Sequence, residues 1–436
     1  MTGYADFLAA KTRHVQPTGP TVRPGDTHPS LHDWQAQLVA WAVRTGNAAL
    51  WADTGLGKTR MQLEWARLTA PAGGRTLIVA PLAVCQQTVR EAARIGVDLR
   101  YARSDDGQPG MVITNYEMTD RFDPATIDAV VLDESSILKD FASKTRDRLI
   151  GQFAKTPARL ACTATPAPND VAELANHAEF LGAATRREML GTYFVHDQDG
   201  WRAKGHARGP MFAWMSGWAA AVRRPSDLGY PDDGYVLPEL SIVPELLPVE
   251  VAPEGQLFAT DLGGVGGRAK VRRATLTARV GRAAELVAAE PGEAWLLWCG
   301  LNDEADALAR AIPGAVNVHG SLSPEEKAEL LLAFADGQIS TLVTKPAIAA
   351  FGLNWQHCAR MAFVGLSDSY ETYYQAIRRC WRYGQTRPVR AHVVLSELES
   401  QIAANVARKE RDAARFTAEL VDAMRVNSHW KVDNDD

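Results

Sequence analysis

The stretch that decides the fold is Trp51-Ala52-Asp53-Thr54-Gly55-Leu56-Gly57-Lys58-Thr59, which continues the apolar run of residues 48–51. An apolar run that stops at a glycine-bearing turn and is followed by a helical pattern is typical of a phosphate-binding loop. Glycines lack a Cβ, so backbone N–H groups can surround phosphate oxygens at the start of a helix. The Lys58 ammonium then reaches the β and γ phosphates, and the Thr59 hydroxyl can ligate Mg²⁺. The general pattern has glycine where this chain has Ala52, so a chance turn before a helix is the alternative. The residues predicted to bind nucleotide here are Thr54, Gly55, Leu56, Gly57, Lys58 and Thr59.

Length and composition are those of an ordinary multidomain globular protein. With 436 residues, 46% of them hydrophobic and 23% charged, the chain predicts about two or three domains. The net charge of -5 does not indicate a nucleic-acid binder, but a local basic cleft would suffice for one. The five scattered cysteines include no C-x-x-C pair, which favours a reducing compartment over a disulfide framework or a zinc cluster. No apolar run is long enough to span a membrane, so we expect a cytoplasmic protein.

Strand and helix patterns alternate after the loop. Buried strands are expected at 76–80, 111–114, 129–132 and 159–163, with helical patterns between them. This alternation predicts a parallel, doubly wound sheet whose ligands lie beyond the carboxyl ends of the strands.

Two carboxylates stand at one of these strand ends. Asp133 and Glu134 directly follow the apolar strand 129–132. Phosphoryl transfer needs a carboxylate that holds Mg²⁺, the role we expect for Asp133, and a group that orients the attacking water, the role of Glu134. A solvated turn is the alternative for an isolated Asp-Glu pair.

A second alternation begins at residues 295–299 and predicts another α/β lobe. The predicted parts of the chain are a lead-in (1–30), a first lobe (31–250) with an insertion (180–250), a linker (251–270), a second lobe (271–395), and a helix with an acidic tail (396–436) that braces the second lobe.

Nine short motifs stand in a characteristic order. They are L-H-D-W-Q (31–35), A-D-T-G-L-G-K-T (52–59), L-I-V-A-P-L (77–82), V-I-T-N-Y-E-M (112–118), L-D-E-S-S (132–136), C-T-A-T-P (162–166), V-H-G-S-L-S (318–323), G-L-N (352–354) and Q-A-I-R-R-C-W-R-Y-G-Q (375–385). Together they resemble the core of superfamily 2 helicases and translocases, most closely the Swi/Snf-like branch, over residues 31–395. That branch commonly has alanine at the first loop position, as Ala52 does here.

The resemblance implies two tandem RecA-like lobes with ATP bound between them. Gln35 then contacts adenine, which suits an amide that both donates and accepts, although an ordinary surface glutamine is the alternative. Arg379 and Arg382, three apart and so expected on one helix face, join Lys58, Asp133 and Glu134 as catalytic residues. Further nucleotide-binding residues implied are Gly352, Asn354 and Gln375. Nucleic-acid contacts are expected at Asn115, Tyr116, Thr163, Thr165, His319 and Trp355.

Two positions depart from the family pattern. Ser136 replaces the usual histidine, which puts one polar link between the ATP site and the C-T-A-T-P motif in question. Arg378 replaces the usual glycine, and either crowds the helix expected over 370–383 or adds a DNA contact.

A hairpin with aromatic and basic side chains is predicted over residues 193–204, with its turn at Asp199-Gly200, within the insertion. Trp201, Arg202 and Lys204 could contact nucleic acid by stacking and phosphate pairing, or the aromatic side chains could simply pack. A helix is expected to follow over 211–223.

The predicted function is that of a monomeric ATP-dependent DNA translocase or helicase that uses ATP and Mg²⁺ on duplex or forked DNA. The pattern at 345–358 resembles helicase-like proteins of bacteriophages and prophages, which suggests phage DNA replication, recombination or repair in the cytoplasm of a bacterium. The alternatives are an RNA-directed helicase and a non-catalytic DNA-binding scaffold.

Overall fold

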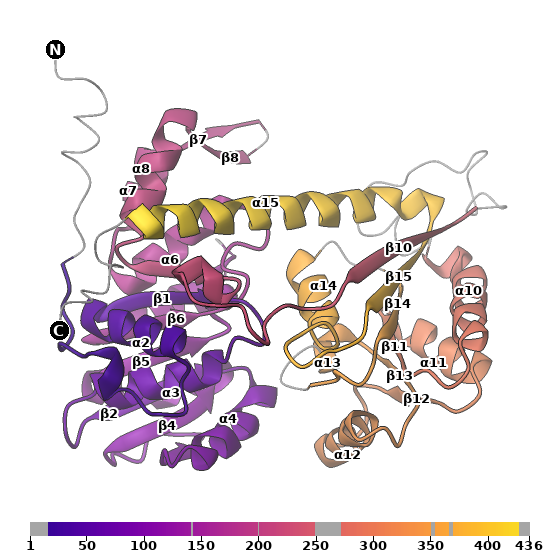
Figure 1. Cartoon of the computed structure of the whole chain (residues 1–436), viewed down its shortest axis with the longest axis horizontal. Helices are drawn as coiled ribbons and strands as arrows, with labels where there is room; N and C mark the ends of the chain where they lie inside the picture. The colour runs from indigo at the N-terminus through magenta and orange to yellow at the C-terminus, as the bar shows by residue number, and fades with distance from the viewer. Residues whose placement is uncertain are drawn as a thin grey trace. The chain divides into compact units, whose positions relative to one another are not determined.

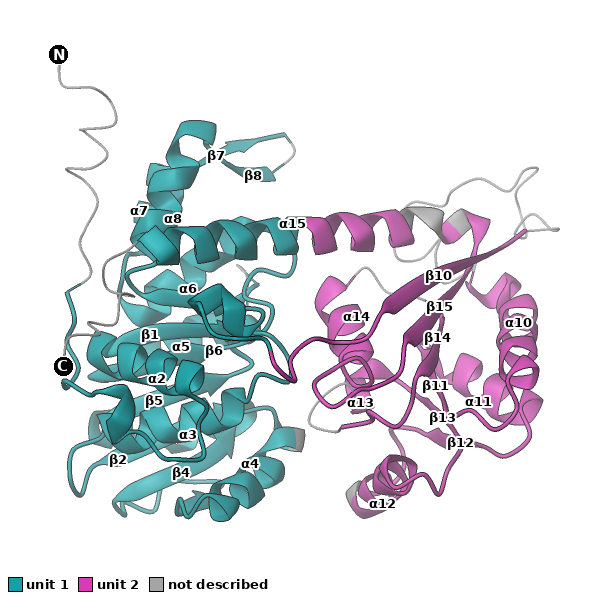
Figure 2. Cartoon of the chain, in the orientation of Figure 1, with its two compact units in different colours: residues 1–232, 412–436 teal, residues 233–411 magenta. Residues whose placement is uncertain are grey.

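Two parallel sheets organise the chain, one in each of two units. The computed structural model describes residues 16–140, 143–198, 200–248, 272–349, 354–365 and 369–426. Unit 1 comprises residues 1–232 and 412–436, and unit 2 comprises residues 233–411 (Figure 2).

The sheet of unit 1 has seven parallel strands in the order β3-β4-β2-β5-β6-β1-β9. Figure 1 labels five of them, β1, β2, β4, β5 and β6. The strands are β1 (Asn47–Ala52), β2 (Arg75–Ala80), β3 (Leu99–Tyr101), β4 (Gly110–Asn115), β5 (Ala129–Asp133), β6 (Ala158–Cys162) and β9 (Ala219–Val222). Runs such as Ala129-Val130-Val131-Leu132 are buried throughout, as expected for central strands of a parallel sheet.

Helices connect these strands. They are α2 (Asp33–Thr45), α3 (Lys58–Thr69), α4 (Leu82–Arg94), α5 (Lys144–Phe153), α6 (Leu174–Leu181), α7 (Arg186–Tyr193) and α8 (Arg208–Met215). In α2 the first helical residue is Asp33, where its charge favours the helix N-terminus. The helix ends at Gly46, whose φ of 79° lies in a region that glycine tolerates best.

The insertion confirms the predicted hairpin and corrects its surroundings. Strands β7 (Phe194–Asp197) and β8 (Gly200–Ala203) pair antiparallel, but Tyr193 ends α7 instead of starting the hairpin. The helix expected over 211–223 is wrong beyond Met215, because Ala219–Val222 pairs with β1 as an additional parallel strand. Pairing with β1 in the tertiary structure thus overrides the helical preference of the alanines in Ala219–Val222.

The sheet of unit 2 has six parallel strands in the order β10-β15-β14-β11-β13-β12. The strands are β10 (Leu240–Leu247), β11 (Trp295–Cys299), β12 (Ala315–Val318), β13 (Thr341–Thr344), β14 (Arg360–Val364) and β15 (Val389–Ser396). The helices are α10 (Leu276–Ala289), α11 (Asn302–Ala311), α12 (Pro324–Ala335), α13 (Pro346–Ala349) and α14 (Tyr370–Ile377).

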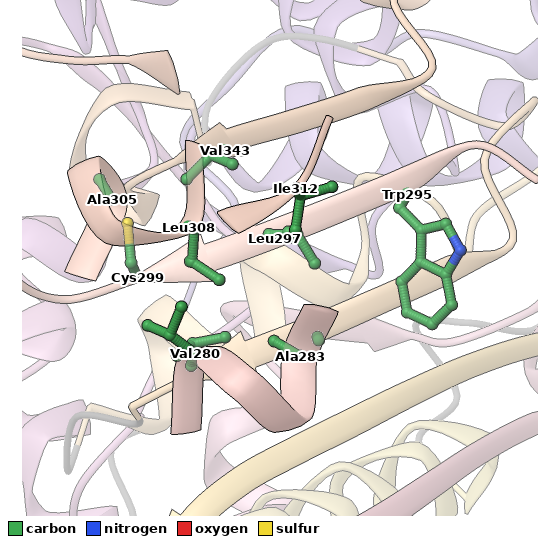
Figure 3. Packing of buried hydrophobic residues seen from close by; sticks show 11 residues of the cluster. Val280, Ala283, Trp295, Leu297, Cys299, Ala305, Leu308, Ile312 and Val343 are labelled. Carbon is green, nitrogen blue, oxygen red and sulfur yellow. The ribbon is translucent and has the colours of Figure 1, made fainter. Parts of the chain in front are cut away.

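The core of unit 2 joins α10 and α11 to the central strands (Figure 3). Val280 and Ala283 of α10 and Leu308 of α11 belong to one buried cluster with Leu297 of β11 and Val343 of β13. Small and branched apolar side chains at helical spacing make this contact possible.

The boundary between the units lies earlier than the sequence suggested. Strand β10, expected within the first lobe, pairs over its whole length with β15, so it is an edge strand of the second sheet. Strand β15 itself was not predicted. The linker expected at 251–270 lies outside the described residues.

The C-terminal helix α15 (Ser400–Val426) requires a second correction. Its residues from Asp412 onward belong to unit 1, although we expected the helix to brace the second lobe. The Phe416 ring lies 5.9 Å from Trp51 and 5.6 Å from Phe212, and Arg425 donates to the carbonyl oxygen of Ser226. Aromatic packing next to the phosphate-binding loop therefore comes from the far end of the chain.

The predicted fold class is confirmed: the chain forms two α/β lobes with parallel sheets, as expected for tandem RecA-like domains, with a small hairpin and helical insertion. Within the described part of the chain, none of the helices has the length and apolar character needed to cross a membrane.

Candidate nucleotide-binding site

The phosphate-binding loop joins β1 to α3 in a conformation that requires its glycines. Gly55 and Gly57 have φ values of 89° and 77°, and Gly57 caps the N-terminus of α3. Lys58 and Thr59 are the first two residues of that helix. The Lys58 ammonium donates to the carbonyl oxygens of Ala52 at 2.9 Å and Asp53 at 3.4 Å. The lysine is therefore folded back over the loop, where a phosphate group would replace weak backbone acceptors.

Gln35 fastens α2 to the same loop. Its Nε2 donates to the carbonyl oxygen of Leu56 at 2.9 Å, and its Oε1 accepts from the backbone of His32 at 2.9 Å. A Cβ on Gly57 would lie 2.5 Å from Gln35 Nε2, so the close approach depends on glycine. Gln35 is thus placed beside the loop, and its contact with adenine stays a prediction.

Asp133 ends β5 and is only 6% exposed. Its Oδ1 accepts from Gln62 Nε2 at 2.7 Å and from the backbone of Glu134 at 3.1 Å. Burial raises the pKa of Asp133, while the Gln62 hydrogen bond and the Lys58 charge act in the opposite direction. The carboxylate therefore lies beside the helix that carries Lys58, where a Mg²⁺ ligand is needed.

Gln62 itself was not predicted as a site residue. It lies four residues after Lys58, hence on nearly the same face of α3, and this spacing could have identified it.

Glu134 adopts a backbone conformation that is unusual for its residue type. With φ 54° and ψ 52°, it is the only non-glycine residue with positive φ among the described residues. Thr163 Oγ1 donates to Glu134 Oε2 at 3.2 Å, and the backbone of Thr165 donates to Thr163 Oγ1 at 3.1 Å. Non-glycine residues in such a backbone conformation occur most often at active sites and ligand-binding sites, where the backbone orients a functional side chain. The two threonines, predicted as nucleic-acid contacts, thus connect the C-T-A-T-P motif to the carboxylate.

A buried histidine on α6 contacts the L-D-E-S-S motif. His177 Nε2 and Ser135 Oγ lie 3.1 Å apart, and the imidazole is completely buried. Burial lowers the pKa of His177 to about 4, so the ring is neutral near pH 7. Ser136, which stands at the usual histidine position, donates from its Oγ to the Glu134 carbonyl oxygen at 3.4 Å. Sequence reasoning missed His177 because no local pattern links residues 42 positions apart.

Two further predicted nucleic-acid residues lie at the carboxyl end of β4, Asn115 as its last residue and Tyr116 directly after it. Asn115 is 4% exposed and Tyr116 is 5% exposed. The Tyr116 hydroxyl donates to the carbonyl oxygen of Asp133 at 2.6 Å, and burial raises its pKa. The Tyr116 side chain therefore supports the acidic motif from within unit 1, whereas Asn115 is a buried residue at the end of β4.

In unit 2, the predicted arginine pair occupies a turn and not a helix. Helix α14 ends at Ile377, so the expected single helix face for Arg379 and Arg382 is wrong. Arg379 is 6% exposed, and its Nε donates to the Gln375 carbonyl oxygen at 3.3 Å.

Arg382 has an incompletely satisfied guanidinium group. Its Nε is buried and has no hydrogen-bond partner among the described residues. Burial, followed by the charges of Arg379 and Arg378, lowers the pKa of Arg382 to about 9. A buried N–H donor beside like charges is a favourable position for an anionic oxygen.

The remaining predicted residues of unit 2 differ in burial and in their contacts. Gln375 and Trp355 are buried, and the Trp355 backbone donates to the Arg379 carbonyl oxygen at 3.0 Å. Asn354 is exposed, and the His319 ring nitrogen lies 2.7 Å from Ser321 Oγ. Gly352 lies outside the described residues.

Arg202 is bound within the hairpin, and Lys204, which follows β8, is bound to α7. Arg202 pairs with Asp197 at 3.1 Å, and Lys204 Nζ donates to the Gly191 carbonyl oxygen at 2.8 Å. The Trp201 ring centroid lies 4.8 Å from that of His196. Contact of the hairpin with nucleic acid stays a prediction.

These residues fit a nucleotide with Mg²⁺ on structural grounds. The loop needs glycine at Gly57, and the buried Asp133 carboxylate lies near the Lys58 charge. Each of these features is accounted for by a polyphosphate and its divalent cation.

Comparison with known proteins relates unit 2 to helicases. Residues 279–384, which include Arg379 and Arg382, match the helicase conserved C-terminal domain. No curated protein sequence matches the chain. A solved structure described as the Sulfolobus solfataricus SWI2/SNF2 ATPase core in complex with dsDNA is 18% identical and has a TM-score of 0.44, covering 94% of this chain and 97% of that chain. The chain thus contains a segment similar to the C-terminal domain of helicases, which supports the helicase part of the sequence prediction.

Proposed function

We propose that the protein is a DNA-dependent ATPase that couples ATP hydrolysis to movement along DNA. The observation that carries this proposal is the 2.7 Å hydrogen bond between Gln62 and Asp133. It brings the helix that begins with Lys58 next to the strand that ends with Asp133, so that one nucleotide can meet both groups. Such a pairing of a lysine-bearing loop with an acidic strand end is what phosphoryl transfer requires.

Each side chain then has a distinct task. Lys58 binds the β and γ phosphates, while Thr59 and Asp133 hold Mg²⁺, which neutralises charge on the phosphate oxygens. Glu134, held by Thr163 at 3.2 Å, orients the attacking water and accepts its proton. The geometry of Glu134 supports this role, since its strained backbone aims a carboxylate from a rigid strand end.

Arg379 and Arg382 complete the proposed site. The buried, unsatisfied Nε of Arg382 supports a role in binding phosphate oxygens as charge develops on them. The proposal requires these groups to reach the nucleotide held by Lys58 during turnover. Because they belong to the other unit, hydrolysis would depend on the conformations of both units, and stepping along DNA could use that dependence.

The proposed substrate is duplex or forked DNA, and the proposed setting is phage DNA replication, recombination or repair. The Swi/Snf-like motifs favour translocation along duplex DNA, and the pattern at 345–358 resembles phage and prophage proteins. The hairpin β7–β8 is the proposed element for fork contact.

ATP hydrolysis measured with duplex, single-stranded and forked DNA, and with RNA, at several salt concentrations tests the proposal. We expect stimulation by DNA above RNA, and a loss of about 100-fold or more in Lys58→Ala and Glu134→Gln. Lys155→Ala, at an exposed lysine of unit 1, is the matched control and should leave the rate unchanged. Undiminished hydrolysis in Lys58→Ala or Glu134→Gln would refute the assignment, and preferential stimulation by RNA would favour the RNA-directed alternative.

Triplex displacement and strand separation distinguish the two modes of movement. Displacement of a third strand without unwinding indicates duplex translocation, whereas unwinding of forks that is lost on deleting residues 194–203 indicates a wedge. A deletion without effect on either assay would restrict the hairpin to packing.

A further inference from the structure

Arg378, which stands where related motifs have glycine, is not a surface residue. It is 7% exposed, and its guanidinium carbon lies 4.4 Å from the centroid of the Trp381 ring and 5.2 Å from that of Tyr374. The cation is thus enclosed by two aromatic side chains, three and four positions away. A buried guanidinium against aromatic faces is a directional contact, because the planar group must lie over the rings.

This arrangement contradicts one interpretation suggested by the sequence and disfavours the other. Arg378 does not crowd a helix, because α14 ends at Ile377 and Arg378 caps it with φ -70° and ψ 1°, a conformation that needs no glycine. A direct DNA contact is disfavoured by burial of the side chain.

The enclosed cation stabilises the turn that follows α14. The backbone of Trp381 donates to the Ile377 carbonyl oxygen at 3.0 Å, so the tryptophan folds back toward the helix end. Its Nε1 donates to the carbonyl oxygen of Pro238 at 2.7 Å, which fixes the ring to the segment before β10. Arg378 Nη1 also approaches the Trp381 carbonyl oxygen at 3.5 Å. The Arg378 side chain therefore contacts the residues at both ends of the turn, Tyr374 on the helix and Trp381 after it.

Arg379 lies within this turn, and Arg382 is the residue that follows it in the sequence. Their separation and direction follow from the backbone path between Arg378 and Trp381, since α14 no longer imposes helical spacing there. The Arg378 charge contributes to lowering the pKa of Arg382, and it counteracts the burial that raises the pKa of Glu410 on α15, so Arg378 lies among charges of both signs.

We propose that Arg378 is a positioning residue: by lying between Tyr374 and Trp381 it holds Arg379 and Arg382 in the geometry that binds a transferring phosphoryl group. This inference rests on the proposed ATPase function and assigns to Arg378 no contact with ATP.

The test compares three substitutions in the full chain by steady-state, DNA-stimulated ATP hydrolysis: Arg378→Lys, Arg378→Leu and Arg378→Gly. Misplaced transition-state groups lower kcat, so we expect Arg378→Gly to reduce kcat about 10- to 100-fold with a KM for ATP within about twofold of wild type. Lysine keeps a cation that can lie over the rings, whereas leucine keeps only apolar volume. The expected order of kcat is therefore arginine, lysine, leucine, glycine.

The order of lysine and leucine separates positioning from packing. If Arg378 only fills space, leucine is tolerated better than a buried ammonium, and kcat for Arg378→Leu equals or exceeds that for Arg378→Lys. That result would overturn the inference, as would wild-type kcat in Arg378→Gly. The lysine and leucine variants decide the matter even if the glycine variant fails to fold.

Two parallel measurements keep this test separate from that of the proposed function. Arg390→Leu, at a 47% exposed arginine paired with Glu290, controls for loss of an arginine in the same unit and should retain activity. Lys58→Ala reports on the function itself. Inactive Lys58→Ala together with a fully active Arg378→Gly refutes only the role of Arg378, whereas a fully active Lys58→Ala refutes the function beneath it.

Discussion

Acidification should destabilise unit 1 around the acidic motif because His177 is buried in its neutral form. The pKa of this imidazole is lowered from 6.5 to about 4 by burial against Ser135 and Trp51. In the unfolded chain His177 takes up a proton as the pH falls below about 6.5, whereas the folded chain resists until about pH 4. Stability is therefore level above pH 6.5 and falls as the pH drops from 6.5 toward 4.

The magnitude follows from the two pKa values. Their difference corresponds to about 3 kcal/mol in total, at about 1.4 kcal/mol for each pH step of one. Between about pH 6.5 and pH 5, the contribution of His177 to the free energy of unfolding should therefore fall by about 2 kcal/mol.

Hydrogen exchange of peptides covering α6 and β5, corrected for the intrinsic pH dependence of exchange, measures this effect without requiring two-state unfolding of a two-unit protein. His177→Gln removes the titration and retains an amide that can bond Ser135. Between pH 6.5 and pH 5, the free energy of opening measured by exchange should fall by about 2 kcal/mol less in this variant than in wild type. His206→Gln, at an exposed histidine, is the control. Equal pH dependence in wild type and His177→Gln would refute the argument.

Three further substitutions have defined outcomes. Gly57→Ala places a Cβ 2.5 Å from Gln35 Nε2 at a φ of 77°, so nucleotide binding, measured by fluorescence titration, should weaken at least about tenfold. Gln62→Leu removes the 2.7 Å hydrogen bond to Asp133; a bond to a charged group is worth about 1.5–3 kcal/mol, so Mg²⁺-dependent hydrolysis should fall about 10- to 100-fold. Arg279→Met breaks an ion pair of 2.8 Å in which both partners are fully buried, and should lower the stability of unit 2 in urea by about 3–5 kcal/mol.

Matched controls exist for these variants. Gly25→Ala adds a Cβ with no atom within 4 Å and should not affect binding. Arg390→Leu removes an exposed pair, whose contribution should be at most about 1 kcal/mol. Effects of similar size in a variant and its control would contradict the structural explanation.

Much of unit 1 could be predicted because its signals are local. The strand before Asp133, the glycines of the loop and the first residues of α3 each depend on a few neighbouring residues, and all lie where the patterns indicated. The predicted helix over 211–223 failed for the opposite reason. The alanines at 219–221 favour a helix in isolation, but β1 offers a parallel edge with which residues 219–222 pair.

The arginine turn shows the same limit within the site. The sequence located Arg379 and Arg382 but placed them on a helix, because the pattern from Tyr370 onward is compatible with continued helical turns. The structure ends α14 at Ile377 and encloses Arg378 between Tyr374 and Trp381. The ring of Trp381 is fixed by Pro238, a residue 143 positions away, which no local pattern can reveal.

The sequence by itself determined the two parallel α/β lobes and the chemical groups around the phosphate-binding loop, because strand alternation, glycine conformation and helix starts are properties of short segments. Only the tertiary structure decided the surroundings of those groups: Gln62 on Asp133, His177 behind Ser135, Phe416 against Trp51, and the burial that alters the pKa values of Asp133 and Arg382. The physical reason is that desolvation and hydrogen-bond partners are supplied by residues distant in the chain. Local patterns therefore predict which side chains form the site, whereas long-range packing sets their pKa values, their orientation and their hydrogen bonds.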